Sequence, residues 1–286
     1  MTQGLSDAKL QEYDRNGFVL VERLLSQDII EGLRQEIDGL TRQAISARQN
    51  KDHSFPISSF EFEKDDPSIL RRIQEPNQMS KVFADLCSNP LVISTLQSVL
   101  GHSVRLQRMK LNVKSPGIGA LVDWHQDFAF YPHTNNSVTA LGILIDDVDE
   151  ENAPLMAFPG THKQPVLDHH HNGFFCGSIN MEKCGLDPAK GTKLTGPAGS
   201  VTLHHGHTVH GSAVNRSDKS RRMLFLECAA GDAWPLMSDE IGKDGPIMLS
   251  GELSWTPRME GIDVRLPAPT PELEHDSIYD IQQLRA

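Results

Sequence analysis

The hydrophobic pattern changes its period once along this 286-residue chain, at Gly101. Before this glycine, apolar residues recur at the three- and four-residue spacing of amphipathic helices. After it, apolar and polar residues alternate as in half-buried strands. The first alternating residues are Val104, Leu106, Met109, Leu111 and Val113. Helices followed by short strands predict an α+β domain with a mainly β core.

The N-terminal part, about residues 1–101, is predicted to be mainly helical. Ser6, Ser26 and Asn89 are residue types that cap helix N-termini, and Gly17 and Gly101 can end helices. The expected elements are a helix at 6–16, a strand at 18–21, a longer helix from Ser26 to about residue 40, and helices at 77–86 and 89–100. From about residue 44 to 67 the pattern fails. We expect an irregular segment there, of the kind that often covers a site.

The β core is expected to span about residues 102–232. Its apolar positions slip from even to odd near Gln107, and such a slip predicts a β-bulge. Further strands are expected at 138–145, 154–158, 199–204, 207–211 and 222–229. A polar insertion at 163–198 and an irregular tail after the core complete one predicted domain, 1–286. No internal repeat or linker divides the sequence.

Composition excludes several classes of protein. A formal net charge of −11 argues against general nucleic-acid binding, which needs clustered Lys and Arg. No apolar run reaches the roughly 20 residues of a membrane span. The four cysteines form no CxxC pair, and we expect free thiols in a cytoplasmic protein that acts on a small molecule. The oligomeric state has no signature in the sequence.

The stretch Asp123–Tyr131 concentrates residues that bind metals. In an extended segment, His125 and Asp127 point to the same side, because side chains repeat every second residue. His210 could supply a third ligand, and two His with one carboxylate are typical of non-haem Fe(II) oxygenases. An HxD triplet alone is weak, because such pairs arise by chance. His204, His205 and His207 compete with His210 for this role.

Arg221 raises the specificity of this pattern. It follows His210 across the polar turn 215–220, so two neighbouring strands would place it beside the metal. A planar guanidinium there is suited to a bidentate grip on a carboxylate. A cosubstrate that chelates iron at one end and presents a carboxylate at the other, such as 2-oxoglutarate, would bridge the two. Of the competing histidines, only His210 has the following Gly-Ser and this spacing to Arg221.

At these residues the sequence resembles the phytanoyl-CoA dioxygenase family of Fe(II)/2-oxoglutarate-dependent oxygenases. The resemblance runs from about residue 6 to 235, and the similar stretches are 13–19, 124–127, 158–163, 210–212 and 215–217 leading to Arg221. It implies a double-stranded β-helix, the cupin-like jelly roll, with the N-terminal helices packed on one side. It also implies that His125, Asp127 and His210 bind Fe(II), that Arg221 holds the distal carboxylate of 2-oxoglutarate, and that O2 is the second cosubstrate. Ser212 matches a position that approaches the same carboxylate.

Two positions depart from the family pattern. Gly142 stands where the best-known members carry a Trp near the cosubstrate, so we expect a roomier wall there. Ala153 stands where the family usually has Gly, which affects the local turn.

Candidates for contact with small molecules lie on the strand that, by the resemblance, lines the mouth of the site. Lys110 could bind 2-oxoglutarate, and Arg108 and Asn112 an anionic substrate; the alternative is that all three are exposed surface residues. Phe130, Tyr131 and Trp234 could pack against the substrate, although such aromatic residues are more often core. For His169–His171 a solvated loop is the favoured interpretation over a second metal site.

The function predicted is hydroxylation of an unactivated C–H bond of a small molecule, with release of succinate and CO2. Lys110 and Arg108 favour a small anionic or zwitterionic substrate such as an aminophosphonate. A natural product or an acyl compound is the alternative substrate. A zinc-dependent, non-oxidative jelly-roll enzyme could use the same three ligands, but it would have no need of Arg221; a ligand-binding protein without activity is a third alternative.

Overall fold

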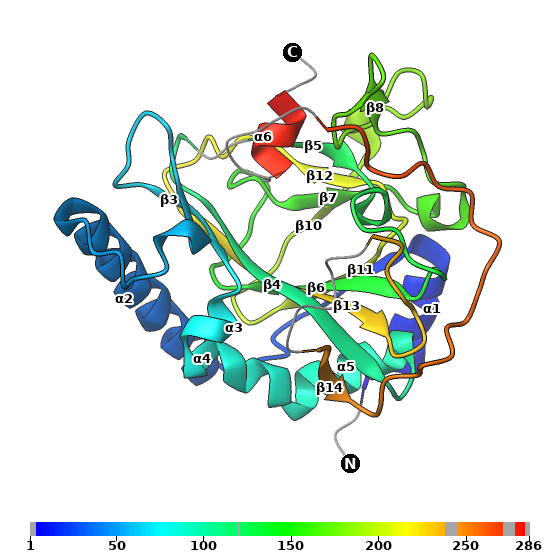
Figure 1. Ribbon diagram of the computed structural model, residues 1–286, viewed down its shortest axis with the longest axis horizontal. Helices are drawn as coiled ribbons and strands as arrows, with labels where there is room; N and C mark the ends of the chain where they lie inside the picture. The colour runs from blue at the N-terminus through cyan, green and yellow to red at the C-terminus, as the bar shows by residue number, and fades with distance from the viewer. Residues whose placement is uncertain (1–3, 119–120, 238–244, 271–277, 284–286) are drawn as a thin grey trace.

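The fold consists of two antiparallel β-sheets that face each other across a pocket (Figure 1). The computed structural model describes residues 4–118, 121–237, 245–270 and 278–283. Within these ranges the larger sheet has eight strands, ordered β1 (Phe18–Val21), β11 (Val201–His205), β6 (Val138–Leu144), β13 (Arg221–Ala230), β4 (Val104–Lys114), β3 (Leu70–Gln74) and β2 (Phe60–Phe62), with β14 (Ile247–Ser250) also on β4. The smaller sheet has the order β10 (Thr192–Leu194), β7 (Leu155–Ala157), β12 (His210–Ser212) and β5 (Val122–His125). Such a pair of sheets forms the predicted jelly roll.

The N-terminal helices pack on the outer side of the larger sheet, as predicted (Figure 1). They are α1 (Asp7–Asn16), α2 (Gln27–Asn50), α3 (Pro76–Met79), α4 (Lys81–Ala84) and α5 (Pro90–Leu100). The side chains of Ser6, Ser26 and Asn89 accept hydrogen bonds from the first turns of α1, α2 and α5, as expected of N-caps. Short 3-10 turns are η1 (Ile57–Ser59), η2 (Asp85–Ser88), η3 (Asp127–Ala129), η4 (Thr161–Lys163) and η5 (Pro188–Lys190), and a two-stranded hairpin joins β8 (His170–His171) to β9 (Phe174–Phe175).

Strand β4 separates the helix-covered core from the pocket. Met109 and Leu111 are fully buried in the largest apolar cluster, whereas Lys110, Asn112 and Lys114 line the pocket. This division follows from the period of two in a strand. One strand therefore contributes both to stability and to the site.

The predicted bulge at Gln107 explains how β4 keeps this division. Against β13, Arg108 lies opposite Glu227 but Leu106 lies opposite Cys228, so Gln107 is the inserted residue. Without it, Leu106 and Met109 would face opposite sides of the sheet; with it, both reach the same core.

Three expectations about local structure were wrong. Helix α2 continues to Asn50, and β2 and β3 lie in or just after the segment expected to be irregular. The single helix expected at 77–86 is interrupted at Ser80, whose backbone is extended and whose hydroxyl caps α4 by accepting from the Val82 N–H. The tail contains β14 and a short helix, α6 (Ile278–Gln283), packed on β5.

The four cysteines are unpaired, as predicted. In the part of the chain that the structure describes, no helix has the length and apolar character to cross a membrane.

Buried neutral histidines should make stability depend on pH. Burial lowers the pKa of His133 from 6.5 to about 4, that of His169 to about 3 and that of His207 to about 4. The unfolded chain therefore binds more protons than the folded chain between pH 6.5 and about 4, and stability falls as the pH falls through this window. Lowering the pH from 7.5 to 5.5 should reduce the free energy of unfolding by roughly 1.4 kcal/mol per histidine, about 4 kcal/mol in all. Urea unfolding at the two pH values measures this difference, and equal stability at both would contradict it.

Candidate metal centre and cosubstrate pocket

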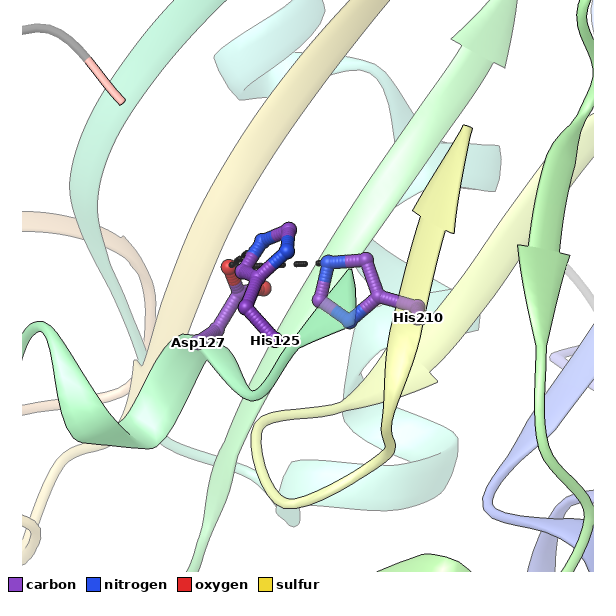
Figure 2. A group of neighbouring side chains, drawn as sticks. All are labelled: His125, Asp127 and His210. Carbon is purple, nitrogen blue, oxygen red and sulfur yellow. Dashed lines mark ion pairs between the residues drawn. The ribbon is translucent and has the colours of Figure 1, made fainter. Parts of the chain in front are cut away.

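His125, Asp127 and His210 meet at the inner face of the smaller sheet (Figure 2). His125 ends β5, Asp127 begins η3 and His210 begins β12. The register of β12 against β5 pairs His210 directly with His125. One ligand atom from each residue lies within 4.8 Å of the other two, and all three residues are buried. Among the described residues, this is the group that could hold a metal ion.

Backbone carbonyls fix the tautomers of both imidazoles. The Nδ1 atom of His125 lies 2.7 Å from the carbonyl oxygen of Asp123, and that of His210 lies 2.9 Å from the carbonyl oxygen of Thr208. Because a carbonyl only accepts, each Nδ1 carries the proton and donates it. Each Nε2 is then left with a lone pair, and both Nε2 atoms lie 3.7 Å from Asp127 Oδ1.

The charge state of the group also suits a divalent cation. Burial alone would raise the pKa of Asp127, but His210, His125 and His204 together hold it well below its usual range. Burial, with the charges of His125 and His204, lowers the pKa of His210. A carboxylate with two imidazoles whose Nε2 atoms face it is a donor set that fits Fe(II) and equally Zn(II).

His204 is a partner of the group that sequence reasoning treated only as a competing ligand. Its Nε2 lies 3.1 Å from Asp127 Oδ2, the oxygen turned away from the other two histidines. Such a contact orients a metal-binding carboxylate from behind. His169 has a similar supporting role: its Nε2 accepts from the Gln126 N–H at 2.9 Å. His169 is 1% exposed, so the expected solvated loop was wrong for this residue.

The metal group opens into a cationic pocket between the two sheets. Of the sequence candidates, the structure brings Lys110, Asn112, Ser212 and Arg221 into this pocket together with the three metal ligands.

Arg221 and Lys114 form the end of the pocket that could hold a carboxylate. They are opposite each other on β13 and β4, and both are at most 2% exposed. Burial lowers the pKa of Arg221 to about 10, and burial together with Arg221 lowers that of Lys114. Lys114 Nζ donates to the carbonyl oxygens of Ser212 and Ala213. An anion between these cations would offset the cost of burying them.

Ala153 positions Arg221. The Nε and Nη2 atoms of Arg221 donate to the Ala153 carbonyl at 3.0 and 2.7 Å. Ala153 has a φ of 63°, a left-handed conformation that costs a non-glycine residue roughly 1 kcal/mol or more. This conformation explains why the family usually has Gly at this position. In this chain the carbonyl of the strained turn accepts from the guanidinium and so orients it.

Glu227, like Lys114, lines the pocket but was not among the residues singled out from the sequence. It is 1% exposed, lines the pocket beside the metal group and forms ion pairs with Lys110 and, at 3.2 Å, with Arg108. Arg108 itself lies outside the pocket lining, in which Lys110, Lys114 and Arg221 face Asp127 and Glu227, a formal charge of +1.

The aromatic candidates lie outside the pocket lining. Phe130 packs edge-on against His125 with ring centroids 5.5 Å apart, so it supports the position of that imidazole. Tyr131 is buried, and the central carbon of the Arg108 guanidinium lies 5.1 Å from the centroid of the Tyr131 ring. Trp234 donates to the Ser254 carbonyl and packs on Trp255 in the tail, away from the metal group.

The expected roomier wall at Gly142 was wrong. A Cβ atom there would lie 2.7 Å from Thr202 Oγ1 and 2.9 Å from the Phe225 ring. Phe225 fills the space from the neighbouring strand and itself lines the pocket.

Comparison with known sequences gives a match over most of the chain. Residues 13–223 match the phytanoyl-CoA dioxygenase (PhyH) family. A probable alpha-ketoglutarate-dependent hypophosphite dioxygenase of Stutzerimonas stutzeri is 36% identical over 279 residues, which cover 96% of each protein. L-proline trans-4-hydroxylase of Streptomyces griseoviridis is 28% identical over 242 residues, covering 78% of this chain and 85% of the relative. Ectoine dioxygenase of Bordetella bronchiseptica is 27% identical over 244 residues, covering 78% and 74%.

Solved structures share the fold. EctD from S. alaskensis, with 2-oxoglutarate and 5-hydroxyectoine, superposes with a TM-score of 0.68 at 20% identity, covering 93% of this chain and 90% of that chain. The carbocyclase SnoK from nogalamycin biosynthesis gives 0.66 at 20% identity, covering 83% and 89%.

Proposed function

Because this chain belongs to the phytanoyl-CoA dioxygenase family, we propose that it uses Fe(II), 2-oxoglutarate and O2 to hydroxylate a compact monoanion. It is a 2-oxoglutarate-dependent dioxygenase that acts on a small molecule. The observation that carries the proposed substrate class is the formal charge of +1 in the pocket lining, where Lys110, Lys114 and Arg221 face Asp127 and Glu227.

His125, Asp127 and His210 would hold the iron, which, when bound, supplies the redox chemistry that couples decarboxylation of 2-oxoglutarate to substrate oxidation. The protein orients the reactants around it. The Asp123 and Thr208 carbonyls keep each imidazole in the ligating tautomer, and His204 holds the carboxylate. Burial of the group excludes bulk water.

The cosubstrate is placed by the cationic end of the pocket. Arg221, fixed by the Ala153 carbonyl, would bind the distal carboxylate of 2-oxoglutarate, with Ser212 beside it. Lys114 adds a buried positive charge next to Arg221. In this arrangement the first choice for binding 2-oxoglutarate moves from Lys110 to Lys114, because Lys110 is paired with Glu227.

A monoanion fits the charge beside the metal better than a zwitterion. It would neutralise the net positive charge of the pocket lining. An aminophosphonate would also need a carboxylate for its ammonium group, and Glu227 is engaged by two cations. The Stutzerimonas relative is named for hypophosphite, a compact monoanion with P–H bonds. Its hydroxylation would convert P–H to P–OH, with one oxygen atom of O2 entering phosphite and the other succinate.

The test is a screen of substrate-dependent succinate release with hypophosphite, 2-aminoethylphosphonate, L-proline and ectoine. We expect the largest response to hypophosphite, with phosphite as the product in ³¹P NMR spectra. A response confined to proline or ectoine would reject the anionic substrate while leaving the dioxygenase activity intact.

Lys110→Met gives this test a structural control. It removes one of the three cations that line the pocket, so the KM for the anion should rise roughly tenfold or more, the scale of a lost hydrogen bond to a charged group. The KM for 2-oxoglutarate should change little. Lys81→Met removes a lysine whose side chain is 84% exposed and should leave both values unchanged.

A further inference from the structure

The C-terminal helix α6 lies beside the metal site, although it is far beyond the family match, which ends at residue 223. Figure 1 shows it, in red, beside β5, the edge strand of the smaller sheet. Ile278 and Tyr279 of this helix line the same pocket as the metal ligands. The family's shared region therefore leaves part of the pocket wall to a segment outside it.

Gln282 connects α6 to the metal ligand His125. Its Oε1 accepts from the Asp123 N–H at 2.8 Å, and its Nε2 donates to the Gly177 carbonyl at 2.9 Å and, at 3.3 Å, to the Asp123 carbonyl. That same Asp123 carbonyl fixes the tautomer of His125. Gln282 is 8% exposed, so these contacts are shielded from water.

Tyr279 connects α6 to the cationic end of the pocket. It is 3% exposed, and its ring lies 3.8 Å from the centre of the Arg71 guanidinium. Arg71, Arg72 and Arg221 all act electrostatically on its hydroxyl. Arg72, which lies opposite Asn112 on the pocket-facing side of β3, is 5% exposed.

Two of these arginines, Arg71 and Arg72, have buried nitrogen atoms without a hydrogen-bond partner in the part of the chain that is described. Arg72 has an ion pair with Glu61 at 3.6 Å, but its Nε and Nη1 are buried without a hydrogen-bond acceptor in the part of the chain that is described. Buried donors of this kind usually indicate a ligand or water that completes them. A carboxylate bound at Arg221 would add negative charge to this cluster of cations and lower the repulsion among them.

We propose that α6 is part of the active site: Tyr279 closes the carboxylate end of the cosubstrate pocket, and Gln282 is a positioning residue for His125. The role of Tyr279 rests on the proposed use of 2-oxoglutarate, whereas the role of Gln282 rests on metal binding alone. Cosubstrate binding and metal-ligand geometry are thereby linked through one short helix.

The test of Gln282 is metal affinity of the full-length protein, measured by equilibrium dialysis with Co(II) as the probe. Gln282→Leu removes both the donor and the acceptor, and we expect affinity to fall roughly 10- to 100-fold, the range for lost support of a metal ligand. Gln282→Glu keeps the acceptor for the Asp123 N–H, so its metal affinity should fall less. Gln27→Leu, which removes a comparable bond to the Ala198 carbonyl far from the pocket, is the matched control. Affinity equal to wild type in Gln282→Leu, or an equal loss in Gln27→Leu, would overturn the positioning role.

The test of Tyr279 is the dissociation constant of 2-oxoglutarate, measured anaerobically with Fe(II) by the visible charge-transfer band. Tyr279→Ala should raise it about tenfold through lost packing on the arginines, and Tyr279→Phe should stay closer to wild type if the ring dominates. Unchanged affinity in Tyr279→Ala would reject the closing role. Failure of the wild type to bind 2-oxoglutarate would instead reject the proposed function. The role of Gln282 would still be decided by its own metal-affinity measurement.

Discussion

Asp127→Ala should abolish substrate-dependent succinate formation, lowering turnover by about 10³-fold or more, as removal of one member of an interdependent catalytic group does. Asp127 is the single carboxylate in the metal-binding group of the described residues. Without it, the two imidazoles of this group remain without a carboxylate, and His204 loses its hydrogen-bonding partner. The measurement is succinate release with saturating 2-oxoglutarate and Fe(II).

Folding must be separated from ligand loss in this experiment. In the wild type, metal binding should raise the melting temperature, because a ligand that binds the folded state stabilises it. In Asp127→Ala the metal-free protein should melt near the wild-type temperature while the metal-dependent rise disappears. Asp14→Ala, in which the lost carboxylate is 84% exposed, should behave as wild type in both assays. Undiminished turnover in Asp127→Ala would contradict the assignment of Asp127 as a metal ligand.

The sequence was most informative where the chemistry is local. His125 and Asp127 are two residues apart, and the helix caps Ser6, Ser26 and Asn89 act within one turn of their helices. The register that pairs His210 with His125 is a contact between distant segments. Period and capping cannot reveal such a contact, so His210 could be chosen only through the residues that follow it.

The residues missed in the pocket had weak signals. Lys114 is in phase with Lys110 and Asn112 on β4, so extending the alternation by one step would have found it. Glu227 is a lone acid among the apolar residues of β13, and a charged residue in a buried strand calls for a functional explanation.

Other features left no readable signal. Helix α6 has six residues, too few to show a period, and a helix of this length depends on tertiary packing for its stability. The position of Phe225 against Gly142 is likewise a cross-strand contact, which the glycine alone suggested as empty space.

Arg221→Ala should raise the KM for 2-oxoglutarate by about 10²-fold, equivalent to roughly 3 kcal/mol, which is the scale of charge-assisted hydrogen bonds to a carboxylate. Lys114 cannot replace it fully, because its ammonium group already donates to the carbonyls of Ser212 and Ala213. The KM for 2-oxoglutarate in Arg221→Lys should lie between the values for the wild type and for Arg221→Ala, since lysine keeps the positive charge but lacks the planar guanidinium. The KM for the substrate should change much less.

The neighbouring Arg222 provides a matched control for this prediction. Its side chain is held by Asp146 and Asp38 on the opposite face of β13, so Arg222→Ala should lower stability without changing the KM for 2-oxoglutarate. Anaerobic titration of the Fe(II) protein with 2-oxoglutarate supplies an independent binding measurement through the charge-transfer band. A zinc-dependent enzyme that uses the same three ligands would develop no such band and would have no dependence on Arg221 for cosubstrate binding. Equal effects of the two arginine substitutions would indicate a general loss of structure and contradict the carboxylate-binding role of Arg221.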